Sequence, residues 1–292
     1  MRRVEDYGVL LDAVRGVRWP ARRKVTGALP GAHQSRMRGI APEFAEYRPY
    51  RQGDDPRRLD WRVLARTDRA YLRLSTDRSI LATMLVVDAS ASMAYPPETL
   101  DKWQCARRLA IALAAVAYGE RDPVGAIVNT ERGMLRLGAR TRRGVVGELA
   151  RMLDHVHPGG APALGNAARA AMTSGRVVVI TDFLGDAEAL LAVAREHTAA
   201  GGEVHAVHIL AREELDPPAR AVTAVDPEDD EVARTLAPAT REEYLSSFAA
   251  WREGLARDWR AAGATHTAVA ADEPVARAVR RIVAPAFAGA AP

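Results

Sequence analysis

The sequence predicts an α/β fold in which a central, mostly parallel sheet is covered by helices on both faces. Short apolar runs rich in valine and isoleucine alternate with longer segments of helical periodicity throughout residues 79–292, and this alternation is typical of such sheets. Two of the apolar runs end in an aspartate, Asp88 and Asp182. Ligands of open α/β sheets bind beyond the carboxyl ends of the strands, so both acids are candidate site residues.

Residues 1–78 have a different pattern and are expected to form a small N-terminal subdomain of a helix and short strands. Residues 4–17 carry apolar side chains at helical spacing, and the pattern breaks near Pro20. Residues 26–43 are rich in Gly, Pro and Arg, which predicts a loop. Residues 43–76 alternate short apolar and charged groups, which predicts irregular structure with short strands, one of them at 71–74.

Residues 79–292 are expected to form the α/β domain itself. The predicted strands are short and rich in β-branched residues and lie at residues 81–87, 122–129, 176–181, 203–210, 219–225 and 266–269. The predicted helices carry apolar residues three and four positions apart and lie at residues 100–118, 143–156, 164–172, 187–199, 242–261 and 274–283. A hairpin is expected where residues 133–137 follow the second strand.

Composition limits the classes of function. The net charge is +4, divided into +8 for residues 1–78 and −4 for residues 79–292. The basic residues are interleaved with acids, so no nucleic-acid partner is expected. Cys105 is the only cysteine, which excludes an internal disulfide and a cysteine zinc cluster. The chain has no apolar run of membrane-spanning length and no signal-peptide pattern at its start, so it is expected to be cytoplasmic and not membrane-spanning.

The segment Asp88-Ala-Ser90-Ala-Ser92 is the main candidate site. One carboxylate and two hydroxyls at a strand end suit a hard divalent cation, above all Mg²⁺, which is held by few protein groups. If the strands that end at Asp88 and Asp182 are neighbours, both carboxylates reach the same crevice. Asp88, Ser90 and Ser92 are therefore the candidate metal ligands, and Asp182 is a candidate fourth member of the site. The simpler interpretation of Asp88 is a helix N-cap or turn former.

This motif resembles the metal-ion-dependent adhesion site of von Willebrand factor A domains, which implies a Rossmann-like fold and a metal-dependent binding role. In that family a threonine on a later loop and an aspartate after a later strand complete the site, and Asp182 matches the latter. The loop at residues 157–163, where the threonine is expected, contains no hydroxyl. Thr181 and Thr130 are the candidate replacements.

A second block, residues 39–62, narrows the resemblance. Its Gly53-Asp54-Asp55 and Asp60-Trp61 segments closely resemble the signature of the bacterial "domain of unknown function 58" family, and the likeness extends over roughly residues 30–285. Members resemble von Willebrand A domains with an added N-terminal subdomain and are linked to MoxR-type AAA+ ATPases. The acids and arginines of the block are expected to form ion pairs or a partner-binding surface. Phe44 and Trp61 are expected to be anchors in the core.

The resemblance implies a non-enzymatic adaptor or assembly factor that acts with a MoxR-type AAA+ ATPase on an unknown protein client, with Mg²⁺, Mn²⁺ or Ca²⁺ at the site. Two alternatives stay open. One is a scaffold with a degenerate metal site. The other is a Mg²⁺-dependent phosphohydrolase, which would need a second aspartate two residues after Asp88, where this chain has Ser90. The chain lacks a phosphate-binding P-loop, so it is not expected to be an ATPase itself.

Overall fold

The chain forms two compact units. The computed structural model describes residues 7–21, 30–34, 44–51, 54, 59–75, 78–218, 222–225, 233–236 and 240–284. The larger unit joins Met1–Trp19 to Ala82–Pro292, and the smaller unit is Pro20–Leu81. This division differs from the expected boundary after residue 78. The first helix belongs with the α/β unit, because Val14 and Trp19 directly after it are buried in that unit's core.

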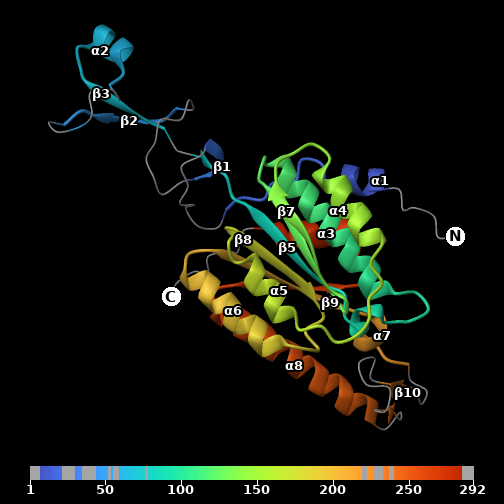
Figure 1. Ribbon diagram of the computed structural model, residues 1–292. Coiled ribbons are helices and arrows are strands. Elements are labelled where there is room, and N and C mark those ends of the chain that lie inside the picture. The colour runs from blue at the N-terminus through green and yellow to red at the C-terminus, as the bar shows by residue number, and fades with distance from the viewer. Residues whose placement is uncertain are drawn as a thin grey trace. The chain divides into compact units, whose positions relative to one another are not determined.

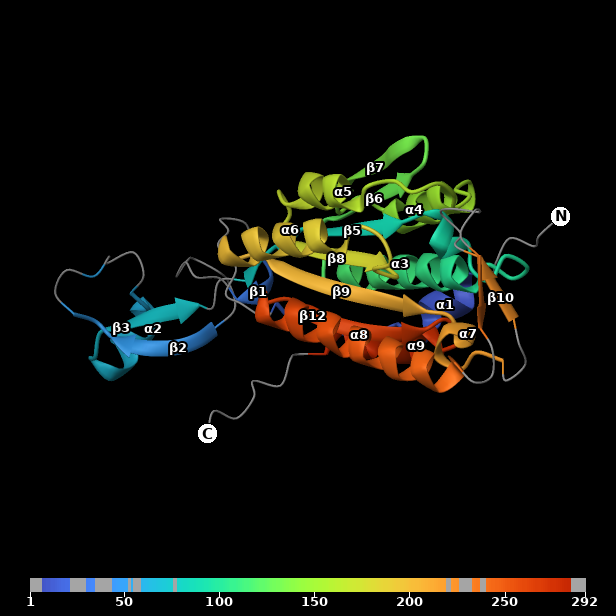
Figure 2. The ribbon, with the colours of Figure 1, turned by 90° about the horizontal axis from the view of Figure 1, so that it is seen from below.

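The larger unit is built on a six-stranded sheet, and its fold is the predicted α/β class (Figure 2). The strand order is β12-β9-β8-β5-β6-β7, and every neighbouring pair is parallel except the hairpin of β6 and β7. The strands are β5 (Thr83–Asp88), β6 (Val124–Thr130), β7 (Gly133–Arg140), β8 (Arg176–Thr181), β9 (Glu203–Leu210) and β12 (Thr265–Ala270). The central strands β5, β8 and β9 are buried along their whole length, which explains their continuous apolar sequence.

Helices cover both faces of this sheet (Figure 1). One face carries α1 (Tyr7–Ala13), α3 (Asp101–Gly119), α4 (Val145–Asp154) and α9 (Val275–Val283). The other carries α5 (Leu164–Ala171), α6 (Ala187–Ala199) and α8 (Arg241–Ala261). Each face buries its own hydrophobic cluster, and α3 is the most deeply buried helix of the first. The predicted helices and strands of residues 79–292 are confirmed, some to the residue and others with their ends displaced by one to three residues.

Several short elements were not predicted from the sequence. They are the 3-10 turn η2 (Ala91–Ala94), the one-turn helix α7 (Arg212–Leu215) and the strand β11 (Ala233–Leu236). The last pairs in antiparallel register with β10 (Val222–Val225), which lies inside a predicted strand. All of these elements are too short for periodicity to reveal.

The smaller unit contains two antiparallel strand pairs and a short helix. β1 (Pro30–Gln34) pairs with β4 (Arg78–Ser79), and β2 (Phe44–Pro49) pairs with β3 (Tyr71–Ser75). The prediction of a loop over residues 26–43 is therefore wrong for β1. The helix α2 (Trp61–Thr67) was not predicted as a helix.

The start of α2 explains part of the signature block. The Asp60 side chain caps the helix by accepting bonds from the backbone N–H groups of Arg62 and Val63, so this aspartate is structural. Trp61 is 64% exposed, and its prediction as a core anchor is wrong because the first residue of this capped turn points into solvent. Arg48 pairs with Asp54 at 2.7 Å, as expected of the block. Asp55 and the two arginines after Pro56 lie outside the described residues.

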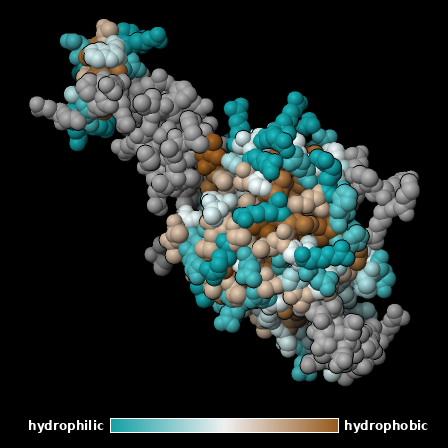
Figure 3. Space-filling model, viewed as in Figure 1, coloured by the Kyte–Doolittle hydropathy of each residue, from teal (hydrophilic) through white to brown (hydrophobic). Residues whose placement is uncertain are grey.

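The surface of the larger unit shows no broad apolar belt on the face seen in Figure 3, where hydrophilic and hydrophobic side chains are interspersed. Met134 and Leu135 on β7 are among its exposed large apolar residues. No helix in the described ranges is long and apolar enough to cross a membrane.

A buried arginine holds the amino-terminal ends of the central strands together. Arg176, the first residue of β8, is fully buried and donates from Nε to Glu203 Oε2 at 3.2 Å. Its Nη1 lies 3.7 Å from a carboxylate oxygen of Asp122. The guanidinium also stacks over the Trp19 ring at 4.3 Å and donates to the Trp19 carbonyl at 3.3 Å. One side chain thus connects β8, β9, the start of β6 and the chain segment after α1.

Replacing Arg176 by methionine is expected to lower the free energy of unfolding by about 3–5 kcal/mol, because it leaves two buried carboxylates without their cation. Urea denaturation at pH 7 measures this. The control is Arg169→Met, which removes an exposed pair with Glu196 and should cost no more than about 1 kcal/mol. Similar losses in the two variants would show that Arg176 has no such role.

Candidate functional site

Two neighbouring strands bring the predicted site residues together. β5 and β8 are adjacent and parallel, with Val87 opposite Ile180, so Asp88 and Asp182 follow at the same edge of the sheet. Both are buried, at 6% and 2% exposure. Ser90 and Ser92 lie just beyond the end of β5, around the start of η2, and are also buried. The condition for a shared crevice, that the two strands are neighbours, is met.

Asp88 is held by neutral hydrogen-bond donors. Its Oδ1 accepts a bond from the Ser90 backbone N–H at 2.9 Å, and its Oδ2 accepts one from Thr181 Oγ1 at 2.6 Å. The hydroxyl oxygens of Ser90 and Ser92 lie 3.0 Å apart. Thr181 therefore provides a hydroxyl at Asp88. The Thr130 hydroxyl instead donates to a carbonyl of its own turn at 2.7 Å.

The loop before α5 packs against the motif through its backbone. Gly159 donates its N–H to the Ala89 carbonyl at 2.9 Å, and Ala91 donates to the Gly160 carbonyl at 2.8 Å. Gly160 has a φ of +64°, and a Cβ there would lie 2.7 Å from a side-chain carbon of Glu131. Glycine is thus required both by conformation and by space. The loop supports the motif without contributing a hydroxyl.

A buried lysine binds Asp182, and the sequence did not predict it. Lys102 Nζ on α3 donates to Asp182 Oδ2 at 2.8 Å and pairs with Glu214 Oε1 on α7 at 2.6 Å. Glu214 is held in turn by the backbone N–H of Ala211 at 2.7 Å. Lys102 is only 1% exposed. A lone lysine in a strongly apolar helix was the available signal, because lysine is rarely buried unless it is paired.

Burial and neighbouring charges set the protonation of this cluster. Burial raises the pKa of Asp88 to about 6, and the hydrogen bond from Thr181 opposes that rise. Burial alone would lower the pKa of Lys102, but the charges of Asp182 and Glu214 outweigh it and place this pKa above its usual value. Lys102 is therefore a permanent cation within the site at neutral pH.

The donor set fits a hard divalent cation. Asp88, Ser90 and Ser92 offer one carboxylate and two hydroxyl oxygens, the ligand types that Mg²⁺ accepts. Asp88, Asp182 and Glu214 with Lys102 sum to a formal charge of −2, which one divalent cation balances. Among the described residues, no three His, Cys, Asp or Glu side chains are grouped to hold a metal ion. Any metal binding here thus depends on the serine hydroxyls.

A comparison with protein families identifies the chain. The model of the family "Protein of unknown function DUF58" matches residues 46–254. The chain belongs to the DUF58 family. The uncharacterized protein Rv1480 of Mycobacterium tuberculosis is 30% identical to this DUF58 chain over 302 aligned residues, covering 96% of the chain and 90% of the relative. The uncharacterized protein Mb1516 of Mycobacterium bovis matches with the same identity and coverage.

Solved structures similar to the DUF58 chain include two from Bacteroides. An aerotolerance-related membrane protein from Bacteroides fragilis is 18% identical, with a TM-score of 0.45, covering 69% of this chain and 96% of that one. The conserved hypothetical protein BatB from Bacteroides thetaiotaomicron is 17% identical, with a TM-score of 0.45, covering 70% and 97%. The SpRpn10 VWA domain is 11% identical, with a TM-score of 0.38, covering 69% and 94%.

The raised pKa of Asp88 predicts a pH dependence of stability in EDTA. The folded protein holds this proton more tightly than the unfolded chain, whose aspartate pKa is near 3.8. The stabilising contribution is therefore complete below pH ~4 and is lost as the pH rises through ~6. Asp88→Asn should remove this decrease of the free energy of unfolding with rising pH. It should also raise the free energy of unfolding at pH 7 by roughly 1–3 kcal/mol.

Urea denaturation between pH 4 and 8 measures the effect of Asp88→Asn. Asp258→Asn, on the exposed side of α8, is the control and should keep the wild-type profile. An unchanged slope in Asp88→Asn would show that Asp88 does not titrate in this range.

Proposed function

We propose that this DUF58 protein is a non-enzymatic protein-binding adaptor whose adhesion-type site, at Asp88, Ser90, Ser92 and Asp182, binds Mg²⁺, with Mn²⁺ or Ca²⁺ as alternatives. The observation that carries the proposal is the pair of hydroxyls 3.0 Å apart beside the buried Asp88 carboxylate. In the described ranges that carboxylate forms no ion pair with a basic side chain. When bound, the cation would offer an open coordination position to a partner's carboxylate.

The proposed partners are a MoxR-type AAA+ ATPase and a protein client. Family membership supports this choice, since the sequence resembles the family linked to those ATPases. The fold supports a binding role as well, because the strand ends of an open α/β sheet are where such domains bind their ligands.

An adaptor agrees better with the site than a phosphohydrolase does. The hydrolase would need an acid/base carboxylate two residues after Asp88. That position is Ser90, and its hydroxyl lies within hydrogen-bond distance of Ser92. The second carboxylate of the site, on Asp182, is bound to Lys102 instead.

A metal-free adaptor is the second candidate, and one observation favours it. The Lys102 ammonium lies 2.8 Å from Asp182 and supplies a positive charge that would otherwise come from a metal ion. In this case the strand-end cluster, formed by Asp88, Ser90, Ser92, Asp182, Lys102 and Glu214, would be a structural core of the adaptor, with a degenerate metal site.

Calorimetric titration with Mg²⁺ and Mn²⁺ separates the two candidates. The metal-site proposal predicts saturable 1:1 binding to the wild type that weakens at least about tenfold in Ser92→Ala, because a hydroxyl oxygen that would coordinate the metal ion is lost. Ser247→Ala, at an exposed position on α8, should bind like the wild type. Binding that appears only in Lys102→Met would instead establish the metal-free candidate, since removal of the ammonium would then create the site.

A pull-down with a purified MoxR-type ATPase tests the adaptor itself. We expect retention of the ATPase in Mg²⁺ and a loss of at least about tenfold in EDTA or in Asp88→Ala, because the partner's carboxylate would lose its cation. Asp258→Ala is the control and should retain the ATPase. Equal retention in EDTA would contradict the metal bridge, and no retention in any condition would contradict this partner.

A further inference from the structure

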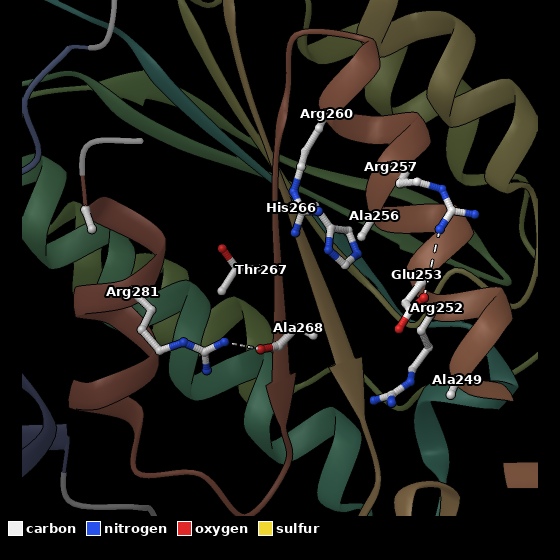
Figure 4. A pocket seen from close by; sticks show the side chains of 11 residues that line it. Ala249, Arg252, Glu253, Ala256, Arg257, Arg260, His266, Thr267, Ala268 and Arg281 are labelled. Atoms are coloured by element: carbon white, nitrogen blue, oxygen red, sulfur yellow. Dashed lines mark hydrogen bonds and ion pairs between the residues drawn. The ribbon is translucent and has the colours of Figure 1, made fainter. Parts of the chain in front are cut away.

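A second candidate surface lies away from the strand-end cluster, along the edge of the sheet. A groove of about 750 Å³ is bordered by α8, by β12 and by the end of α9. Figure 4 shows β12 between α8 and α9. Side chains of both helices lie on the two sides of the strand. This volume is in the range of ordinary ligand sites.

The floor of the groove is the outer edge of β12, with which no described strand pairs. β12 is the last strand of its sheet and pairs only with β9 among the described strands. The Ala268 carbonyl accepts a bond from Arg281 Nη2 at 2.8 Å (Figure 4), so it points away from β9. A strand residue directs its N–H and C=O to the same side, and residues two apart repeat that direction. The N–H and C=O of His266 and the N–H of Ala268 therefore face the groove and can pair with an added strand, whereas the Ala268 carbonyl is already bound by Arg281.

The walls of the groove are positively charged. The charged side chains that line it are Arg252, Arg257, Arg260, Glu253 and Arg281, a net of +3. Arg281 is bound to Glu273 at 2.7 Å, and Arg257 lies 4.0 Å from Glu253. Arg252 and Arg260 form no ion pair with a described carboxylate. Burial, together with the charge of Arg260, lowers the pKa of His266 to about 4, so His266 is neutral at pH 7.

We propose that the groove binds an extended, acidic segment of a partner protein as an added strand along β12. The strand edge would supply main-chain hydrogen bonds, and the arginines would pair with carboxylates. Alternate side chains of an added strand point to opposite faces, one toward α8 and the other toward α9. Acidic residues at every second position would therefore meet Arg252 and Arg260, and the positions between them would face α9. Six strand residues correspond to a segment about 20 Å long.

Strand addition agrees with the groove better than general anion binding does. A site for free phosphate or a polyanion needs only converging cations, whereas here a strand edge forms the floor and directs the backbone groups of His266 and the N–H of Ala268 toward the groove. The inference does not depend on a metal ion at Asp88, because none of the groove residues belongs to the strand-end cluster.

The test is a fluorescence anisotropy titration of the 292-residue chain with a labelled ten-residue peptide that alternates Glu and Val. We expect saturable binding in 50 mM NaCl that weakens as salt rises. The double variant Arg252→Glu with Arg260→Glu should weaken it by at least about tenfold. Arg280→Glu makes the same kind of charge change on α9 at an exposed position outside the groove, and it should stay within about twofold of wild type.

Two further arms test the main-chain pairing. Ala268→Pro removes the outward N–H and should weaken binding at least about tenfold. The same peptide with N-methyl groups on alternate residues should also fail to bind, and this arm needs no variant of the protein. Equal binding of the N-methylated peptide, or of inorganic polyphosphate, would overturn strand addition and show a general anion site.

The chain's own C-terminal residues, 285–292, are the remaining occupant to test. A protein that ends at Ala284 should bind the Glu-Val peptide as the full chain does. Binding that appears only after this truncation would show that the tail occupies the groove and would overturn the proposal of a partner segment. Absence of peptide binding by both proteins would also overturn it.

Discussion

The parallel pairing of β5 with β8 is the constraint on which the strand-end chemistry depends. Both strands are buried along their whole length, so their register is strongly specified. Because Val87 lies opposite Ile180, the Thr181 hydroxyl can donate a hydrogen bond to Asp88. Asp182 follows Thr181 directly in the chain. A slip by one residue would move these side chains to the other face of the sheet and separate the two carboxylates. The apolar cores on both faces therefore also position the polar groups.

The strand ends also concentrate charge in an apolar setting. Asp88, Asp182 and Glu214 are all mostly buried, and each would cost free energy in isolation. The fold offsets this by placing Lys102 between Asp182 and Glu214 and by supplying neutral donors to Asp88. Three rings in contact lead from Asp182 toward the groove. The ring of Phe183, the residue after Asp182, lies 5.4 Å from the ring of His208, and the ring of His208 lies 5.5 Å from that of His266. The strand-end cluster and the edge groove are thus joined by packed side chains.

The sequence was informative where a segment determines its own structure. The strands 176–181 and 203–210 and the helix 187–199 could be predicted to the residue, because periodicity and burial agree there. The Asp88 motif was visible because its ligand types are adjacent in the chain. Lys102 and Glu214 are 112 positions apart, so no local pattern joins them, and α7 is one turn long. Trp61 was misjudged because its exposure follows from the cap at Asp60, which overrides the usual preference of tryptophan for the core.

Arg176 has a consequence for how the chain is assembled. Its side chain donates to the carbonyl of Trp19, the last residue before the smaller unit, and its backbone N–H donates to the carbonyl of Ala82, the first residue after it, at 2.9 Å. The residue before the smaller unit and the residue after it are thus both hydrogen-bonded to Arg176. Residues 20–81 are therefore an insertion into the α/β unit, as in inserted domains whose two ends lie close together. Because both ends of this insertion are held at Arg176, we expect a change in its length to leave the register of the sheet unchanged.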